Sequence, residues 1–232
     1  MTTLVAIETS AEQASVALLR DAELSVLTTD GVAMHSQSIL PMIQRLFSQA
    51  QIKLSDCDAI AFGAGPGSFT GVRTACSVAQ GLAFGIDAPV LAINTLEAMA
   101  LACHQKTGAD AVLTLLDARM GEVYWAQYNF LSGLEVVTSP RLSAPELVVP
   151  IGVVVACGNG LHVGAGQSLN QTAFASTHPD LMPHAATIAT LAQHALRAGL
   201  QVAAKDAQPI YLRNQVALTT VERLQKKLRE AA

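Results

Sequence analysis

The apolar runs of this 232-residue chain follow an order that repeats, and the repeat limits the possible folds more than any single motif does. Periodicity predicts a first series of three strands, a helix, a strand and a helix, followed by one further strand and helix, over residues 4–7, 15–19, 24–27, 35–50, 59–62, 70–85, 89–93 and 96–106. Three strands then begin a second series, with a short helix, a strand and a last helix, over residues 111–116, 122–128, 134–137, 144–149, 152–156 and 185–198.

Two consecutive βββαβα units predict an α/β protein with a duplicated fold of the actin-like ATPase or RNase H-like kind, whose two lobes face each other across a cleft. The repeat is one of element order, because no residue-level repeat accompanies it. We place the boundary near Gly108, which gives an N-terminal lobe of residues 1–107 and a C-terminal lobe of residues 108–232. This division leaves room for the terminal helix to pack back on the N-terminal lobe.

Composition indicates a compact protein of the cytoplasm. Half of the residues are apolar and 14% are charged, which is enough for a sizeable core. No apolar run is long enough to span a bilayer, the N-terminus has no basic region typical of a signal peptide, and we expect the four cysteines to be buried and reduced. The chain up to residue 204 is acidic and disfavours direct nucleic-acid binding, whereas the tail 221–232 is basic and indicates a solvated helix face or a contact with RNA or a partner.

The stretch GAGPGSFTGVR, residues 63–73, raises the question of a phosphate-binding loop, because it lies between a predicted strand and a predicted helix. The Walker motif, the dinucleotide-binding motif and the nucleophile elbow are all absent from it. Anion binding at the helix N-terminus beside Arg73 stays open. We favour the other interpretation, a turn whose glycines let two backbone segments pack closely.

Two acidic residues end equivalent strands of the two series, Glu8 in the first and Asp117 in the second. Cleft ATPases use such positions to handle Mg²⁺ and phosphates, but their loops also need glycines so that backbone amides reach the phosphate oxygens. Residues 9–11 after Glu8 include no glycine, and residues 118–120 after Asp117 place a bulky cation and a Met where small residues belong. The third loop, residues 157–161, has two glycines. We therefore predict a degenerate cleft at Glu8, Asp117 and Gly158, with no catalytic residue and no confident cofactor site. The six histidines form no metal motif, so we predict no metal site either.

The helices at 39–50 and 70–85 carry more apolar and small residues than one buried face needs. On the second helix, Gly71, Ala75, Ala79 and Ala83 form one stripe of small residues, and Ser77, Gly81 and Gly85 form another. Which stripe faces outward stays open. We predict that the helix pair forms a protein–protein surface, with contacts from Ile39, Met42, Ile43, Leu46, Val72, Ala75, Ala79 and Ala83.

Five segments together resemble the bacterial TsaB family, formerly called YeaZ: IETS, HSQSILPMI, GAGPGSFTGVR followed by AQGLA, LLDARMGEVYWAQY and QPIYLRN. The resemblance is weak over residues 130–205. It implies an actin-like two-lobed fold like that of TsaD, without competent catalysis. TsaD-like proteins carry a two-histidine metal motif in the segment equivalent to residues 34–45, where this chain has His35 and, four residues on, Ile39. Glu8 stands where many family members carry Asp.

The resemblance also implies partners. Family members support a TsaD-like catalytic subunit and act with a TsaE-like ATPase to make threonylcarbamoyladenosine beside the tRNA anticodon. The glycine-rich turn would launch one of two helices that bind TsaD, and homodimers reuse that surface. The chain would contact tRNA only through the complex, and ATP or ADP is conceivable only at the level of the complex.

Two alternatives come from other functional classes. An independent actin-like ATPase or kinase would use Glu8 and Asp117, and nucleotide binding by the isolated chain would reveal it. A peptidase is less favoured, because the chain lacks a metal pair, an elbow serine and a Cys–His motif.

Overall fold

The computed structural model describes residues 2–30, 35–163 and 171–213. It contains two five-stranded mixed sheets with the same topology, in the orders β3-β2-β1-β4-β5 and β10-β9-β6-β7-β8. The strands of the first sheet are β1 (Thr3–Glu8), β2 (Gln13–Arg20), β3 (Glu23–Asp30), β4 (Ala59–Gly65) and β5 (Val90–Asn94). Those of the second are β6 (Ala111–Asp117), β7 (Val123–Asn129), β8 (Glu135–Ser143), β9 (Val154–Cys157) and β10 (Phe174–His178).

Strand directions confirm the duplication. In each sheet the first three strands in chain order are antiparallel neighbours, and the next two continue the sheet in parallel on the other side of the first strand. Strand β1 is therefore equivalent to β6, and β4 to β9. Since β1 ends at Glu8 and β6 ends at Asp117, the two acids occupy equivalent places in the two sheets.

Within the described ranges, four α-helices are formed: α1 (His35–Ala50), α2 (Phe69–Ile86), α3 (Thr95–Thr107) and α4 (Ala185–Arg197). Short 3₁₀ turns cover Leu54–Asp56, Pro145–Leu147, Asn159–His162, Gln171–Ala173 and Ala204–Asp206. The helix predicted at 144–149 is thus a single turn. Strand β10 was not predicted, because its sequence, FASTH, mixes polar and apolar residues and it lies at an exposed edge.

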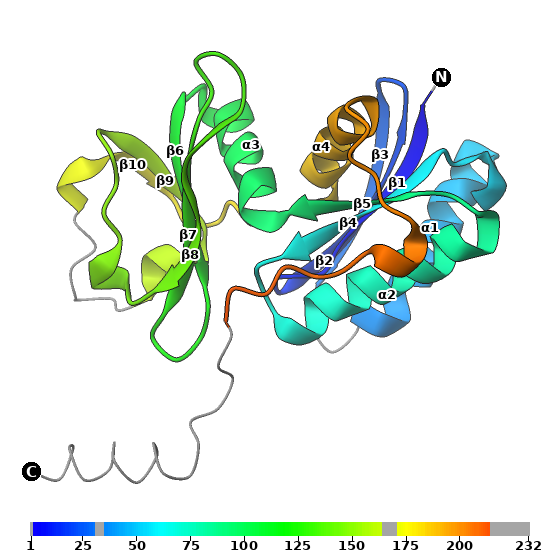
Figure 1. The fold of residues 1–232 in the computed structure, drawn as a ribbon, viewed down its shortest axis with the longest axis horizontal. Helices are drawn as coiled ribbons and strands as arrows, with labels where there is room; N and C mark the ends of the chain where they lie inside the picture. The colour runs from blue at the N-terminus through cyan, green and yellow to red at the C-terminus, as the bar shows by residue number, and fades with distance from the viewer. Residues whose placement is uncertain (1, 31–34, 164–170, 214–232) are drawn as a thin grey trace, which may run out of the picture.

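We call the part built on the first sheet the first lobe and the part built on the second sheet the second lobe. Helices α1 and α2 cover one face of the first sheet, and α4 covers the other face although it comes late in the chain (Figure 1). Helix α3 lies between the lobes and packs on the second sheet through Leu96, Met99 and Cys103. The division of the chain at residues 107 and 108 stays a prediction, and packing crosses it at α3 and α4.

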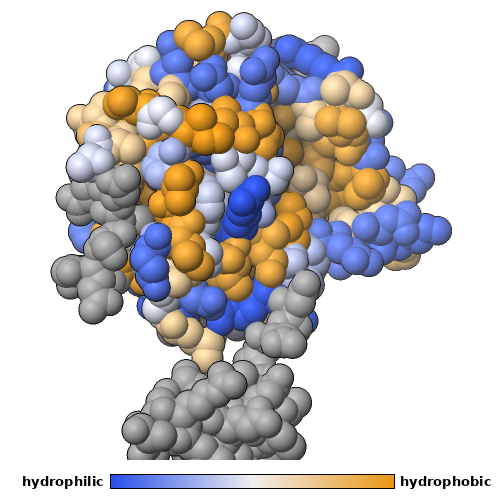
Figure 2. Space-filling view, turned by 60° about the vertical axis from the view of Figure 1, so that its left-hand side comes forward, coloured by the Kyte–Doolittle hydropathy of each residue, from blue (hydrophilic) through white to orange (hydrophobic). Residues whose placement is uncertain are grey.

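The other face of the second sheet is covered by the segment after β8 rather than by an α-helix. Val148 anchors this segment among Leu113, Trp125 and Val154 of the sheet. On either side of Val148, several aliphatic side chains of this segment stay exposed, namely Leu147, Val149, Ile151 and Val153. Figure 2 turns this lobe toward the viewer and shows hydrophobic areas separated by hydrophilic residues.

Candidate functional site

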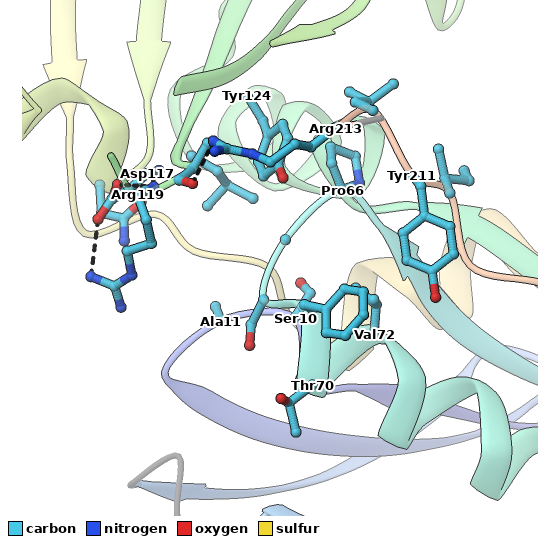
Figure 3. A pocket seen from close by; sticks show the side chains of 18 of the residues that line it. Ser10, Ala11, Pro66, Thr70, Val72, Asp117, Arg119, Tyr124, Tyr211 and Arg213 are labelled. Atoms are coloured by element: carbon cyan, nitrogen blue, oxygen red, sulfur yellow. Dashed lines mark hydrogen bonds and ion pairs between the residues drawn. The ribbon is translucent and has the colours of Figure 1, made fainter. Parts of the chain in front are cut away.

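A cleft of about 690 Å³ lies between the lobes, where the loops at the carboxyl ends of the central strands meet. The first lobe contributes the turn after β1 and the glycine-rich loop before α2, and the second lobe contributes the β6–β7 turn (Figure 3). The chain segment after α4 closes one side. The lining residues are Ser10, Ala11, Glu12, Pro66, Gly67, Ser68, Phe69, Thr70, Val72, Arg73, Leu116, Asp117, Ala118, Arg119, Met120, Tyr124, Asn159, Met182, Ile210, Tyr211, Leu212 and Arg213.

The glycine-rich loop packs against the turn that follows β1, which confirms the interpretation of close backbone packing. A Cβ atom on Gly71 would lie 1.9 Å from the carbonyl oxygen of Thr9, and one on Gly67 would lie 2.6 Å from Cβ of Ser10. The amide of Ser68 donates to the Ser10 carbonyl at 2.8 Å, and the Thr9 hydroxyl donates to the Gly71 carbonyl at 2.7 Å. The glycines are therefore required by contact between two segments of the protein itself.

Glu8 does not line the cleft. Its side chain is fully buried under Gly63, where an added Cβ would lie 1.8 Å from Glu8 Oε2. Oε1 accepts a hydrogen bond from the Ser10 amide, whereas Oε2 has no hydrogen-bond partner among the described residues. Burial raises the pKa of the Glu8 carboxyl, and the Ser10 amide opposes that rise in part. Glu8 is thus placed as a buried structural acid rather than as a ligand facing the cleft.

Asp117 does line the cleft, and neighbouring residues bind both its carboxylate and its backbone amide. Arg119 pairs with it at 3.1 Å and also donates its amide to Asp117 Oδ1 at 2.7 Å. Asn159 Oδ1 accepts the Asp117 amide at 2.9 Å. Arg119 and Met120 both have left-handed backbone angles, with φ of 63° and 59°. The Ala118 amide donates to the Glu122 carbonyl. The amides of Ala118 and Arg119, like that of Ser10, are therefore already hydrogen-bonded within the protein.

Gly158, the third predicted position of the cleft, is also a packing residue. It has a φ of 103°, and a Cβ there would lie 2.0 Å from the Leu115 carbonyl oxygen. The adjacent Asn159 reaches the cleft instead. The structure therefore brings Asp117 and Asn159 to the cleft and leaves Glu8 and Gly158 beneath it.

The segment after α4 crosses the cleft and touches both lobes. In the first lobe, Ile210 donates its amide to the Ala64 carbonyl at 2.7 Å, and Tyr211 accepts a hydrogen bond from Arg73. In the second lobe, Arg213 donates to the Ala118 carbonyl at 2.9 Å and pairs with Glu122 at 2.7 Å. Sequence reasoning missed these roles, because no local signal connects residues 211 and 213 with residues so distant in the chain.

The predicted partner contacts on α1 and α2 require correction. Seven of the eight residues are at most 2% exposed in the chain by itself, so they do not present side-chain surface to a partner as predicted: Ile39, Ile43, Leu46, Val72, Ala75, Ala79 and Ala83. All of them pack in the core beneath the helices except Val72, which borders the cleft. Met42 is partly buried against the same core. The reason is that the first sheet covers the more apolar arc of each helix.

The outward face of the helix pair carries the other stripe. Ser77, Gly81 and Gly85 are exposed on α2, and added Cβ atoms at the two glycines would meet nothing within 4 Å. Phe84 is 84% exposed beside them, and Leu40 on α1 is 46% exposed. We call these five residues, with the surface between them, the outer α1–α2 face. Small residues there leave room for another helix to approach closely.

Metal and membrane features are not found in the parts of the chain that the structure describes. No group of three or more His, Cys, Asp or Glu side chains there could hold a metal ion. No helix in those ranges has both the length and the apolar composition needed to cross a bilayer. The four cysteines are buried and unpaired, as predicted: Cys57, Cys76, Cys103 and Cys157.

Comparison with known proteins identifies the family. A family model described as TsaD, tRNA N6-adenosine threonylcarbamoyltransferase, matches residues 31–221. The tRNA threonylcarbamoyladenosine biosynthesis protein TsaB of Escherichia coli K12 is 36% identical over 92% of this chain and 96% of that protein. The protein of the same name from Haemophilus influenzae is 37% identical over 92% of this chain and 94% of that protein.

A solved structure agrees. YeaZ from Pseudomonas aeruginosa superimposes with a TM-score of 0.85 at 38% identity, covering 91% of this chain and all of that one. The sequence match covers 92% of the chain and the structural match covers 91%. The family model also spans residues 130–205, where the motif resemblance was weak. This chain belongs to the TsaB family, also known as YeaZ.

Proposed function

We propose that this chain is the non-catalytic partner subunit of the complex that installs threonylcarbamoyl on the tRNA adenosine next to the anticodon. In that role it binds and supports a TsaD-like catalytic subunit. The E. coli and H. influenzae relatives are named for the biosynthesis of this modification, and their similarity extends over 92% of the chain.

The observation that carries the non-catalytic part of the proposal is the packing of the glycine-rich loop on Thr9 and Ser10. In a cleft ATPase, backbone amides at such loops bind phosphate oxygens. Here the Ser10 amide is bound to Glu8 and the Ser10 carbonyl to Ser68. Because the Ser10 and Ser68 amides are bound within the protein, these two amides are not available to bind a phosphate or to stabilise charge on a transferred phosphoryl group.

The alternative, an independent ATPase or kinase using Glu8 and Asp117, is disfavoured by the same geometry. The two acids do not converge, since Glu8 is buried and Asp117 is paired with Arg119. We therefore expect no appreciable ATP hydrolysis by the isolated chain. Turnover that disappears in an Asp117→Asn variant would contradict this expectation.

For the partner surface we propose the outer α1–α2 face, and we propose that a homodimer uses it when the partner is absent. A symmetric dimer presents the same face twice, so exposed small and apolar residues on two helices can be buried against their own copy. A TsaE-like ATPase and the tRNA would join through the complex, and the assembly would act in the cytoplasm.

Binding to the TsaD-like protein of the same organism tests this proposal. A Ser77→Arg variant should stay folded, because Ser77 is exposed, and should weaken binding at least about thirtyfold by placing a charge within the interface. Ser139→Arg, an equally large change at an exposed site on β8, is the matched control and should bind normally. Undiminished binding by a folded Ser77→Arg variant would rule out this face.

A further inference from the structure

Arg73 on α2 is held in one orientation although its side chain is exposed. Its guanidinium carbon lies 3.7 Å from the ring centroid of Phe69 and 5.6 Å from that of Tyr211. Its Nε donates a hydrogen bond to the Tyr211 hydroxyl at 2.8 Å. Stacking on one ring and hydrogen bonding to the other fix the plane of the guanidinium before any partner arrives.

The two terminal nitrogens of Arg73 have no hydrogen-bond or ion-pair partner among the described residues. Arg73 also borders a second hollow, of about 450 Å³, between the start of α1 and the outward side of α2. The other described residues that line this hollow are uncharged: Ser36, Phe69, Thr70, Thr74, Ser77 and Val78. The hollow therefore offers one oriented fork of N–H donors, small hydroxyl groups and apolar atoms.

We propose that Arg73 is a preformed anchor for a single carboxylate side chain, Asp or Glu, of the TsaD-like partner. This inference rests on the proposed function and adds the chemistry of the contact. A guanidinium binds a carboxylate through two parallel hydrogen bonds, and its fixed orientation lowers the ordering cost of binding. One guanidinium matches the single charge of a carboxylate, whereas a phosphate group carries about −1.5 to −2.

The position of Arg73 supports a partner protein as the source of that carboxylate. Ser77 belongs both to the hollow and to the outer α1–α2 face, so the anchor adjoins the proposed interface. The body of the chain is acidic, with 15 Asp and Glu against 8 Lys and Arg up to residue 204. Against that background, the fixed positive charge of Arg73 at the edge of the outer α1–α2 face favours one orientation of docking. Arginine beside exposed aromatic rings is also typical of the residues that dominate binding energy at interfaces.

The test is the dissociation constant for the TsaD-like protein of the same organism, measured by calorimetry with full-length variants. Arg73→Lys keeps the charge but loses the fork and the stacking, so binding should weaken at least about tenfold. Tyr211→Phe keeps the ring and removes the hydroxyl that orients Nε, so it should weaken binding by a smaller factor. Arg197→Lys, at an exposed position in the last turn of α4, is the matched control and should bind as the parent does.

The outcomes separate the inference from the proposed function. If the parent chain does not bind the TsaD-like protein, the proposed function fails. If the parent binds and a folded Arg73→Lys variant binds equally well, the anchor is refuted while the function stands. If Arg73→Lys weakens only self-association, measured by sedimentation, the occupant is a second copy and the inference is wrong. Loss of binding in Arg73→Glu, restored by an Asp→Arg or Glu→Arg exchange on the partner, would support it.

Discussion

Replacing Gly71 with alanine tests the role of the glycine-rich loop directly, and Gly81 on the same helix supplies a matched control. At Gly71 the new Cβ would lie 1.9 Å from the Thr9 carbonyl oxygen, far inside any permitted contact. At Gly81 the same methyl group would meet nothing within 4 Å. Since both substitutions add one methyl group to α2, their difference isolates the packing of the loop.

The magnitude follows from the contacts that must move. A carbon normally stays about 3.3 Å or more from a carbonyl oxygen, so Thr9 and the start of α2 would have to separate by roughly 1.4 Å. That shift would strain or break the hydrogen bonds Thr9 Oγ1 to Gly71 O and Ser68 N to Ser10 O. Overpacking costs about 1–3 kcal/mol and a buried unsatisfied group about 1–3 kcal/mol more, so Gly71→Ala should destabilise the fold by about 3–5 kcal/mol. Gly81→Ala should instead stabilise it by about 0.5–1 kcal/mol.

Urea unfolding followed by circular dichroism measures both free energies of unfolding, provided that the slopes with denaturant agree with that of the parent. The expected result is a clear loss for Gly71→Ala and a small gain for Gly81→Ala. If Gly71→Ala lowered the free energy of unfolding by less than about 1 kcal/mol, the loop would not be closely packed in solution, and anion binding there would again need consideration.

Three other predictions concern stability. Burial raises the pKa of Glu8 above its value in the unfolded chain, so the contribution of Glu8 to the free energy of unfolding is complete below the unfolded pKa and is lost as pH rises through the folded pKa, by up to about 1.4 kcal/mol per pH unit. Glu8→Gln should flatten this part of the pH profile, measured by urea unfolding at several pH values, and an unchanged slope would contradict the prediction. Ala79→Arg should abolish cooperative thermal unfolding, because Ala79 is fully buried in the core, and a folded variant would show that the helix face is misassigned. A truncation ending at Thr220 should melt as the full chain does, since residues 221–232 carry many charges and few apolar anchors; this segment lies outside the described residues, and a sharp fall in melting temperature would show that it docks.

The fold could be predicted from sequence because apolar runs and turn residues mark most elements locally. The duplicated element order appeared in the spacing of those runs, and the equivalent positions of Glu8 and Asp117 followed from it. Strand β10 was missed because an exposed edge strand needs no regular apolar pattern.

Side-chain direction was harder to predict than element type. Helix α2 carries two stripes of small residues, and only the position of the sheet decides that Ala75 and Ala79 face inward while Ser77 and Gly81 face outward. The hydrogen bond between Arg73 and Tyr211 joins residues 138 positions apart, so no local pattern could reveal it.

The most direct test of the account is threonylcarbamoyladenosine formation on tRNA in a reconstituted system, measured by mass spectrometry of digested tRNA. We predict that the TsaD-like subunit with its other components forms the modified nucleoside only when this chain is present. Ser139→Arg should support the reaction, and Ser77→Arg should not. Full modification without this chain, or equal support from a folded Ser77→Arg variant, would contradict a partner subunit that acts through the outer α1–α2 face.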